Sequence, residues 1–153
     1  MHLEDIKRAL KSSHLFEDLH ESHLDLVLMV CEELNYQANQ VIFHQDDPGD
    51  ALYIIARGEV EIILESEGAD DAVELATLKD YDTFGEAILI EQGVRSATAR
   101  CLTPVSLVRL PRQRLIRLVN NYPEIGFYIM RRMAADLMEK LRAANLNIRR
   151  AAG

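Results

Sequence analysis

The residues with the clearest chemical potential lie in one short stretch, FGEAILIEQGVRSATA, at residues 84–99. Gly85 lets the backbone turn and approach a ligand closely, and a single helical turn over residues 86–90 would direct unpaired N–H groups at an anion. Arg95 adds a planar guanidinium that matches phosphate oxygens, and Ser96 adds a hydroxyl and an N–H. These residue types predict a site for an organic phosphate.

Glu86 makes that prediction more specific. A carboxylate repels a neighbouring phosphate, so a site for phosphate alone would not select it. It suits a ligand that also carries a hydroxyl donor, such as a ribose 2′-OH, which indicates a nucleotide. In the alternative interpretation Gly85 is a simple turn, Glu86 caps a helix end, and Arg95 makes a surface ion pair worth less than about 1 kcal/mol.

The elements that must position this stretch are predicted to be short strands. Runs rich in β-branched and aromatic residues occur between residues 36 and 110, namely VIFHQ, ALYIIARGEVEIILE, VELATL and SATARCLTPVSLVRL. QDDPGD predicts a turn, because Pro48 presets φ and Gly49 accepts a positive φ, and residues 65–74 predict a hairpin loop. Short strands at this spacing are typical of an all-β sandwich or barrel.

Helical patterns flank the predicted strands. Residues 3–35 are predicted to be helical, with one apolar stripe formed by Leu24, Val27, Leu28, Cys31 and Leu34. Pro111 and Pro123 each suit a first helical turn, and NNYP separates the two helices. The second helix carries a heptad seam, which favours a homodimer through this helix over packing on the chain's own strands. The seam consists of Met130, Ala134, Leu137, Leu141, Ala144 and Ile148.

Composition limits the class of protein. The 153 residues, 48% of them hydrophobic, suit one domain. No apolar run reaches the roughly 18 residues of a membrane span, and the N-terminus lacks a signal-peptide core. Cys31 and Cys101 are interpreted as buried thiols in a reducing compartment. We therefore expect a soluble cytoplasmic protein with no membrane partner.

Charge is distributed unevenly along the chain. The net charge of −8 argues weakly against nucleic acid as a partner. Residues 1–108 hold 7 basic and 22 acidic side chains, whereas residues 109–153 hold 10 and 3. The basic last third is either a set of solvated helix faces or a docking surface for an acidic protein partner.

Two motifs resemble the cyclic nucleotide-binding domain family. FGEAILIEQGVRSATA resembles the family's phosphate-binding cassette, and VIFHQDDPGDALYIIARGEVEI resembles its signature I-F-x-x-G-D-x-G-D-x-L-Y-I-I-x-x-G-x-V. The resemblance covers nearly the whole chain as a single domain, residues 1–153. It implies an α+β fold with an N-terminal helical bundle (about 3–35), an eight-stranded antiparallel jelly-roll barrel (about 36–110) and C-terminal B and C helices (about 111–150).

The resemblance also implies roles for matching residues. Gly85 and the residues after it would donate N–H groups to a cyclic phosphate, Glu86 would accept from the ribose 2′-OH, and Arg95 would clamp the phosphate oxygens. Ile62 and Leu75 would lie under the purine, and Lys140 of the C helix would reach the base. The full predicted set is Phe84, Gly85, Glu86, Ala87, Ile88, Arg95, Ser96, Ala97, Ile62, Leu75 and Lys140. The ligand would be cAMP or cGMP, and Ser96, where some cGMP-preferring relatives have Thr, favours cAMP.

The sequence departs from the family pattern in a few places. Ala87 and Ile88 reverse the usual order of a large and then a small residue, so the Ile88 branch could crowd the ligand. Asn39 and Asp46 stand where Gly is common, and both residue types tolerate a left-handed backbone. The alternative function is therefore a degenerate jelly-roll domain that serves as a ligand-free dimerisation or docking module.

Other functions are not expected. Many relatives carry a helix-turn-helix after the C helix, and this sequence stops at Gly153, so we do not expect direct DNA binding from it. A jelly-roll metalloenzyme needs clustered histidines on neighbouring strands, but only His44 lies among the predicted strands. His20 and His23 are interpreted as a solvated helix face. We predict no enzyme activity, no metal and no cofactor.

Overall fold

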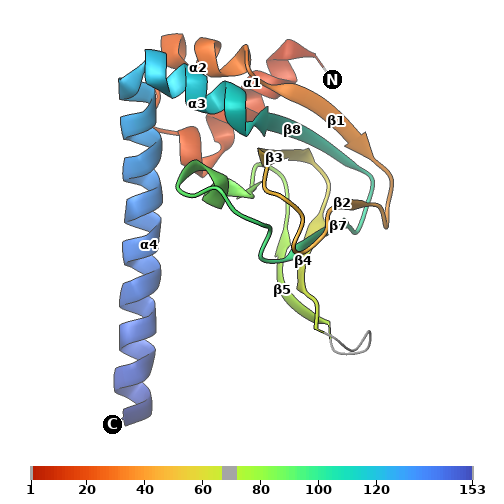
Figure 1. Cartoon of the computed structure of the whole chain (residues 1–153), viewed down its shortest axis with the longest axis vertical. Coiled ribbons are helices and arrows are strands. Elements are labelled where there is room, and N and C mark those ends of the chain that lie inside the picture. Colours follow the sequence, from red (N-terminus) through yellow and green to blue (C-terminus); the bar gives the residue numbers. More distant parts are fainter. Residues whose placement is uncertain (1, 67–71, 153) are drawn as a thin grey trace.

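Two four-stranded antiparallel sheets form the centre of the computed structural model, which describes residues 2–66 and 72–152 (Figure 1). The first sheet has the strand order β1-β8-β3-β6, formed by Glu32–Tyr36, Val105–Pro111, Ala51–Arg57 and Thr83–Phe84. The second has the order β2-β7-β4-β5, formed by Val41–Phe43, Thr98–Cys101, Val60–Leu64 and Val73–Leu78. Over the described residues the strands pair as two separate sheets, so the antiparallel α+β architecture is confirmed and the closed eight-stranded barrel is not. Much of the predicted hairpin loop at 65–74 lies outside the described residues.

Strand β3 explains how the two sides of the first sheet are filled. Successive side chains of a strand point to opposite faces. Tyr53 and Ile55 belong to the core cluster between the sheets, together with Phe84 of β6. Leu52 and Ile54 belong to the cluster under the helices. Because both faces of β3 are covered, its sequence is continuously apolar rather than alternating.

The N-terminal helical region is shorter than predicted. It consists of α1 (Leu3–Ser12), the 3₁₀ turn η1 (His14–Phe16) and α2 (Glu21–Leu28). Leu24 and Val27 are buried on the predicted stripe, but the prediction of helix up to residue 35 is wrong. Leu34 lies in β1 and pairs in register with Leu107 of β8. The long-range ladder with β8 outweighs the weak local helical pattern.

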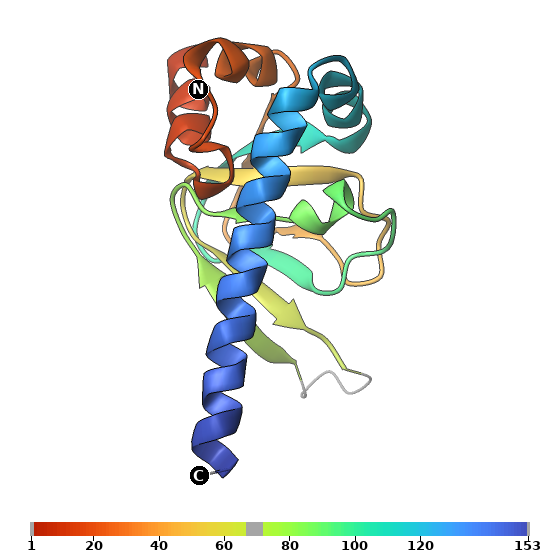
Figure 2. The same ribbon diagram turned by 90° about the vertical axis from the view of Figure 1, so that its left-hand side faces the viewer.

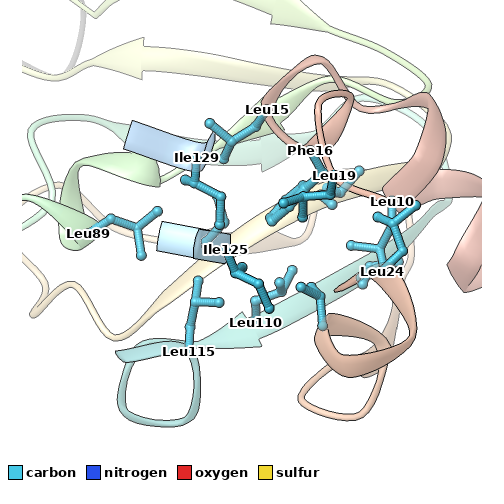
Figure 3. Close-up of a cluster of buried hydrophobic side chains, with 14 of the residues drawn as sticks. Leu10, Leu15, Phe16, Leu19, Leu24, Leu89, Leu110, Leu115, Ile125 and Ile129 are labelled. Atoms are coloured by element: carbon cyan, nitrogen blue, oxygen red, sulfur yellow. The ribbon is translucent and has the colours of Figure 1, made fainter. Parts of the chain in front are cut away.

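The C-terminal helices match the predicted boundaries closely. Helix α3 spans Arg112–Asn121 with Pro111 at its N-cap, and α4 spans Pro123–Ala152. Ile125, Ile129 and Met133 are buried, and Figure 3 shows the first two inside the cluster formed with the N-terminal helices. Figure 2 shows α4 running across the sheets, with the other helices gathered near its first turns.

The later turns of α4 are exposed. Every residue from Leu137 to Ala151 is exposed, and Figure 1 shows the end of the helix extending past the sheets. Of the predicted seam, Leu137, Leu141 and Ile148 are 57%, 62% and 65% exposed. The seam therefore does not pack on the chain's own strands. Across residues 2–66 and 72–152 no helix combines the length and apolarity needed to cross a membrane.

Candidate functional site

The predicted phosphate-binding stretch forms a tight turn at the end of β6. Gly85 follows the strand in the left-handed region, with φ 76° and ψ 17°, and caps the 3₁₀ turn η2 (Glu86–Leu89). A Cβ at this position would lie 2.7 Å from Arg95 Nη1 and 3.2 Å from the Ala51 carbonyl oxygen. Glycine is therefore required both by the backbone angle and by space. The first N–H groups of such a turn have no acceptor within it and can serve a ligand.

The Arg95 guanidinium is buried beside this turn. Its side chain is 5% exposed, and Nη2 donates to the Ala51 carbonyl at 2.7 Å while Nη1 donates to the Gly85 carbonyl at 3.4 Å. Asp50 Oδ1 lies 3.5 Å from Nη2, whereas Nε has no partner among the described residues. Burial lowers the pKa of Arg95, while Tyr53 and Asp50 act in the opposite direction. The result is a largely desolvated cation, the kind of group that binds an anion strongly.

Three aromatic rings form a platform for this guanidinium. Arg95 Cζ lies 4.2 Å from the centroid of the Phe43 ring. Phe43 packs against Tyr53 and Phe84 with centroid distances of 5.9 Å, and the Tyr53 and Phe84 rings are stacked at 5.2 Å. Ring contacts of this kind hold an arginine in place without neutralising it. Phe43 and Tyr53 were not predicted from the sequence, because nothing in the strand pattern shows which ring meets Arg95.

The backbone of Arg95 is held by the QDDPGD turn, in which the positive φ expected at Gly49 falls at Asp46 instead. Arg95 N donates to the Asp47 carbonyl at 2.7 Å, and Asp46 N donates to the Arg95 carbonyl at 2.8 Å. Gly49 N donates to the Gly93 carbonyl at 2.9 Å. Asp46 has φ 73° and Asn39 has φ 71°, which confirms that both adopt the left-handed conformation where glycine is common. The turn and the loop before β7 thus brace each other and fix Arg95.

A cavity of about 510 Å³ lies beside Arg95, within the usual size range for small-molecule sites. The structure places all the predicted site residues except Leu75 around it: Phe84, Gly85, Glu86, Ala87, Ile88, Arg95, Ser96, Ala97, Ile62 and Lys140. Residues that were not predicted also line it: Phe43, Ala76, Leu78, Thr83, Glu91, Gly93 and Val94. Within the described part of the chain the Glu86 carboxylate has no hydrogen-bond or ion-pair partner, so it can accept from a ligand.

Leu75 lies on the other face of its strand. It is 56% exposed and does not line the cavity, whereas Ala76 and Leu78 do. Ile62 of β4 pairs with Ala76 in register. Because side chains alternate between faces, a register error of one residue exchanges the inner and outer positions. We predicted that Leu75 lines the cavity, but the register places its smaller neighbour Ala76 there.

Ile88, the main departure from the family pattern, lines the cavity but is almost fully buried. It is 4% exposed and belongs to the core cluster that contains Leu89. A Cβ added at Gly49 would lie 2.6 Å from Ile88 Cγ2, so the isoleucine branch occupies the space that this glycine leaves open. The cavity of about 510 Å³ remains beside it.

A neighbouring cavity of about 570 Å³ shares Thr83, Glu86, Ala87 and Lys140 with the first. It is lined on its far side by His14, Asp80, Asp82 and Asp136, among other residues. Neither Gly85 nor Arg95 lines it, and its carboxylates would repel an anion. The chemistry suited to a phosphate therefore belongs to the smaller cavity.

Comparison with known proteins indicates the family of the chain. The family model for the cyclic nucleotide-binding domain matches residues 33–122. The cyclic AMP receptor protein of Thermus thermophilus is 32% identical over 139 residues, which cover 91% of this chain and 62% of that protein. The chain thus spans less than two thirds of that relative.

Solved structures give the same result. The catabolite activator protein of Thermus thermophilus matches with a TM-score of 0.75 and 32% identity, over 89% of this chain and 62% of the other. The regulatory domain of Toxoplasma gondii PKA, solved with cAMP, matches with a TM-score of 0.70 and 27% identity, over 78% of this chain and 45% of the other.

Proposed function

The chain belongs to the cyclic nucleotide-binding domain family, and from this premise we propose that it is a cAMP sensor whose ligand occupies the cavity beside Arg95. The observation that carries the proposal is the buried guanidinium at this cavity, next to Gly85 and an unpaired Glu86. Arg95 and the η2 amides bind the cyclic phosphate, and Glu86 accepts from the ribose 2′-OH. Ile62, Ala76 and Leu78 offer apolar contacts to the sugar and base, and Lys140 contacts the ligand from α4.

The preference for cAMP over cGMP has two supports. Ser96 stands where Thr is found in some cGMP-preferring relatives. The Thermus relative is a cyclic AMP receptor protein, and the Toxoplasma structure holds cAMP. Matches to cGMP-dependent kinases of Drosophila melanogaster make cGMP the ligand to compare.

Isothermal titration of the native chain with cAMP and with cGMP tests the proposal. We expect binding of cAMP, and we expect Arg95→Ala to weaken it by about 2–5 kcal/mol, because the variant leaves a buried phosphate unpaired. Arg117→Ala, which removes an exposed arginine of α3, is the control and should bind like the native chain. Absence of heat with both nucleotides would reject the sensor, and native affinity in Arg95→Ala would remove Arg95 from the site.

Ligand binding at η2 is proposed to move the C-terminal helices. Leu89 of η2 lies in the same buried cluster as Leu115 of α3 and Ile125 of α4, and Figure 3 shows these three side chains near one another. A shift of η2 on phosphate binding would change this packing, since close-packed side chains transmit displacement. The ligand can shift α4 only by as much as it prefers one arrangement over the other.

We also propose that α4 mediates a homodimer. The predicted seam is exposed, and Phe127, 59% exposed, extends it by one step toward the start of the helix. An uncovered heptad seam of this length is suited to a second copy of the same helix. If titration shows no nucleotide binding, this surface supports the alternative function, a ligand-free dimerisation or docking module.

A further inference from the structure

Arg112 connects the phosphate-binding turn to the helix that follows the strands. It is the first residue of α3 and is only half-buried. Its Nε donates to the carbonyl oxygen of Ile88 in η2 at 2.9 Å. Its backbone N–H donates to the carbonyl oxygen of Asp50 at 2.8 Å. One residue at the start of α3 therefore contacts both the phosphate-binding turn and Asp50, whose carboxylate lies beside Arg95.

The Ile88 carbonyl accepts its side-chain hydrogen bond from outside η2. The amides of Ile90 and Glu91 both donate to the Ala87 carbonyl, at 3.0 and 3.1 Å. The Ile88 carbonyl, one residue later, instead accepts from Arg112. Arg112 also places a positive charge near the carboxyl end of this turn, where it suits the partial negative charge of the carbonyl groups. Arg112 thus acts on the orientation of the same turn that presents Glu86 and its amide donors.

The second contact links Arg112 to the other half of the site. Asp50 accepts from the Arg112 backbone, and its carboxylate lies 3.5 Å from Arg95 Nη2 and 3.2 Å from Arg109 Nη2. Arg112 therefore contacts η2 directly and is linked to Arg95 through Asp50. In the sequence a single residue, Tyr122, separates α3 from α4, and the two helices share a buried cluster that contains Leu115 and Ile125.

We infer that Arg112 is a positioning residue that sets the orientation of η2 and carries a ligand-induced movement of η2 to α3. This inference rests on the proposed function for its ligand-dependent part. It assigns Arg112 no contact with the nucleotide. The side-chain hydrogen bond to Ile88 is the connection that transmits the change.

Hydrogen exchange measured by mass spectrometry, with and without saturating cAMP, tests this role. Arg112→Met removes the donor and the charge but keeps much of the side-chain length, and Arg112→Gln keeps a neutral donor. Arg117→Met, at an exposed arginine of the same helix, is the matched control. The peptides to compare are residues 84–92, which contain η2, and residues 112–118, which begin α3.

In the native chain we expect cAMP to slow exchange in both peptides. In Arg112→Met we expect cAMP to bind about tenfold more weakly, as for loss of one charged hydrogen bond. At saturation, residues 84–92 should still be protected while residues 112–118 no longer respond. Arg112→Gln should restore part of both effects, which a general loss of stability would not do. A native response of α3 in Arg112→Met would overturn the inference.

A ligand-free comparison separates this inference from the proposed function. Without nucleotide, Arg112→Met should exchange faster than the native chain and Arg117→Met at residues 84–92, because the Ile88 carbonyl has lost its partner. Unchanged exchange there would reject Arg112 as a positioning residue, whatever ligand the chain binds. Failure of the native chain to bind cAMP would instead reject the sensor proposal. The ligand-free exchange of residues 84–92 would then still test whether Arg112 orients η2.

Discussion

At the scale of single residues, Gly85 connects backbone geometry to the placement of charge. Its φ is 76°, and a Cβ added here would lie only 2.7 Å from Arg95 Nη1, so a side chain would force the buried guanidinium to shift. We expect Gly85→Ala to lower the free energy of unfolding by at least about 1–2 kcal/mol, the cost of a left-handed alanine. Displacement of Arg95 adds to this cost. Urea denaturation measures it.

Gly93 is the matched control for this substitution. An added Cβ there meets nothing within 4 Å, and its φ is not in the left-handed region. Gly93→Ala should therefore unfold at a urea concentration close to that of the native chain, or slightly higher because alanine restricts the unfolded chain. Equal stability of the two alanine variants would show that the positive φ and the contact with Arg95 do not constrain Gly85.

At the scale of elements, a polar network fastens the first half of α4 to the N-terminal segment. Arg132 binds Asp18 through both carboxylate oxygens, at 2.9 and 3.0 Å, and approaches Glu17 at 2.9 Å. His14 Nε2 lies 2.9 Å from Asp136 Oδ1. The network ends at Asp136, and the next residue begins the exposed part of the helix. The docked and projecting parts of α4 therefore meet at this point.

This network predicts a pH dependence of stability. The hydrogen bond to Asp136 raises the pKa of His14, helped by the charges of Asp136 and Glu17, whereas partial burial and Arg132 lower it. Because the folded-state pKa lies above the unfolded value, the stabilisation is complete below about pH 6.5 and is lost as pH rises through the folded-state pKa. The side chain is 56% exposed, so solvent screening keeps the effect small.

Melting temperatures measured between about pH 5.5 and 8.5 test this expectation. The native chain should melt higher than His14→Gln at the acidic end, and the difference should shrink toward the alkaline end. His44→Gln, at an exposed histidine outside the network, is the control. A difference that grows with pH would contradict the assigned direction of the His14 pKa shift.

At the scale of the whole molecule, the uneven charge of the chain is partly resolved within the fold. Arginines of the basic last third pair with acids of the earlier part: Arg109 and Arg114 with Glu32, and Arg132 with Asp18. This part of the basic segment therefore pairs with acidic residues of the same chain rather than serving as a docking surface. The basic residues beyond Asp136 lie on the exposed part of α4, where they remain available to a partner.

The same exposed helix carries the predicted dimer. Leu141→Glu places a charge in the middle of the seam and removes from each copy a leucine that the dimer would bury, worth about 1.5–3 kcal/mol each. We therefore expect the dissociation constant of the dimer to rise by roughly 100-fold or more, since about 1.4 kcal/mol is a factor of ten. Sedimentation velocity over a range of protein concentrations measures this change.

Arg142→Glu is the control for the dimer, since residue 142 is the next residue along the helix and lies outside the seam. It should sediment like the native chain. Equal weakening by both substitutions would assign the effect to net charge rather than to the seam. A native chain that stays monomeric at all concentrations would reject the homodimer.

Local features of the site could be predicted from the sequence because they depend on few residues. The turn after β6, the left-handed positions at Asn39 and Asp46, and the starts of α3 and α4 follow from glycine, proline and asparagine or aspartate conformations. These preferences act within one or two residues and survive in the folded chain. The family resemblance supplied the grouping of Glu86 and Arg95, which local rules alone left open.

Only the tertiary structure decided which side chains meet across strands and helices. Leu34 was predicted to be helical but lies in a strand, because β1 pairs with β8. The β4–β5 register places Ala76 rather than Leu75 at the cavity. The stacking of Arg95 on Phe43 and the bond from Arg112 to Ile88 join segments far apart in sequence. Pairings of this kind depend on register and close packing over the whole domain, and a periodic pattern in one segment carries no information about its distant partner.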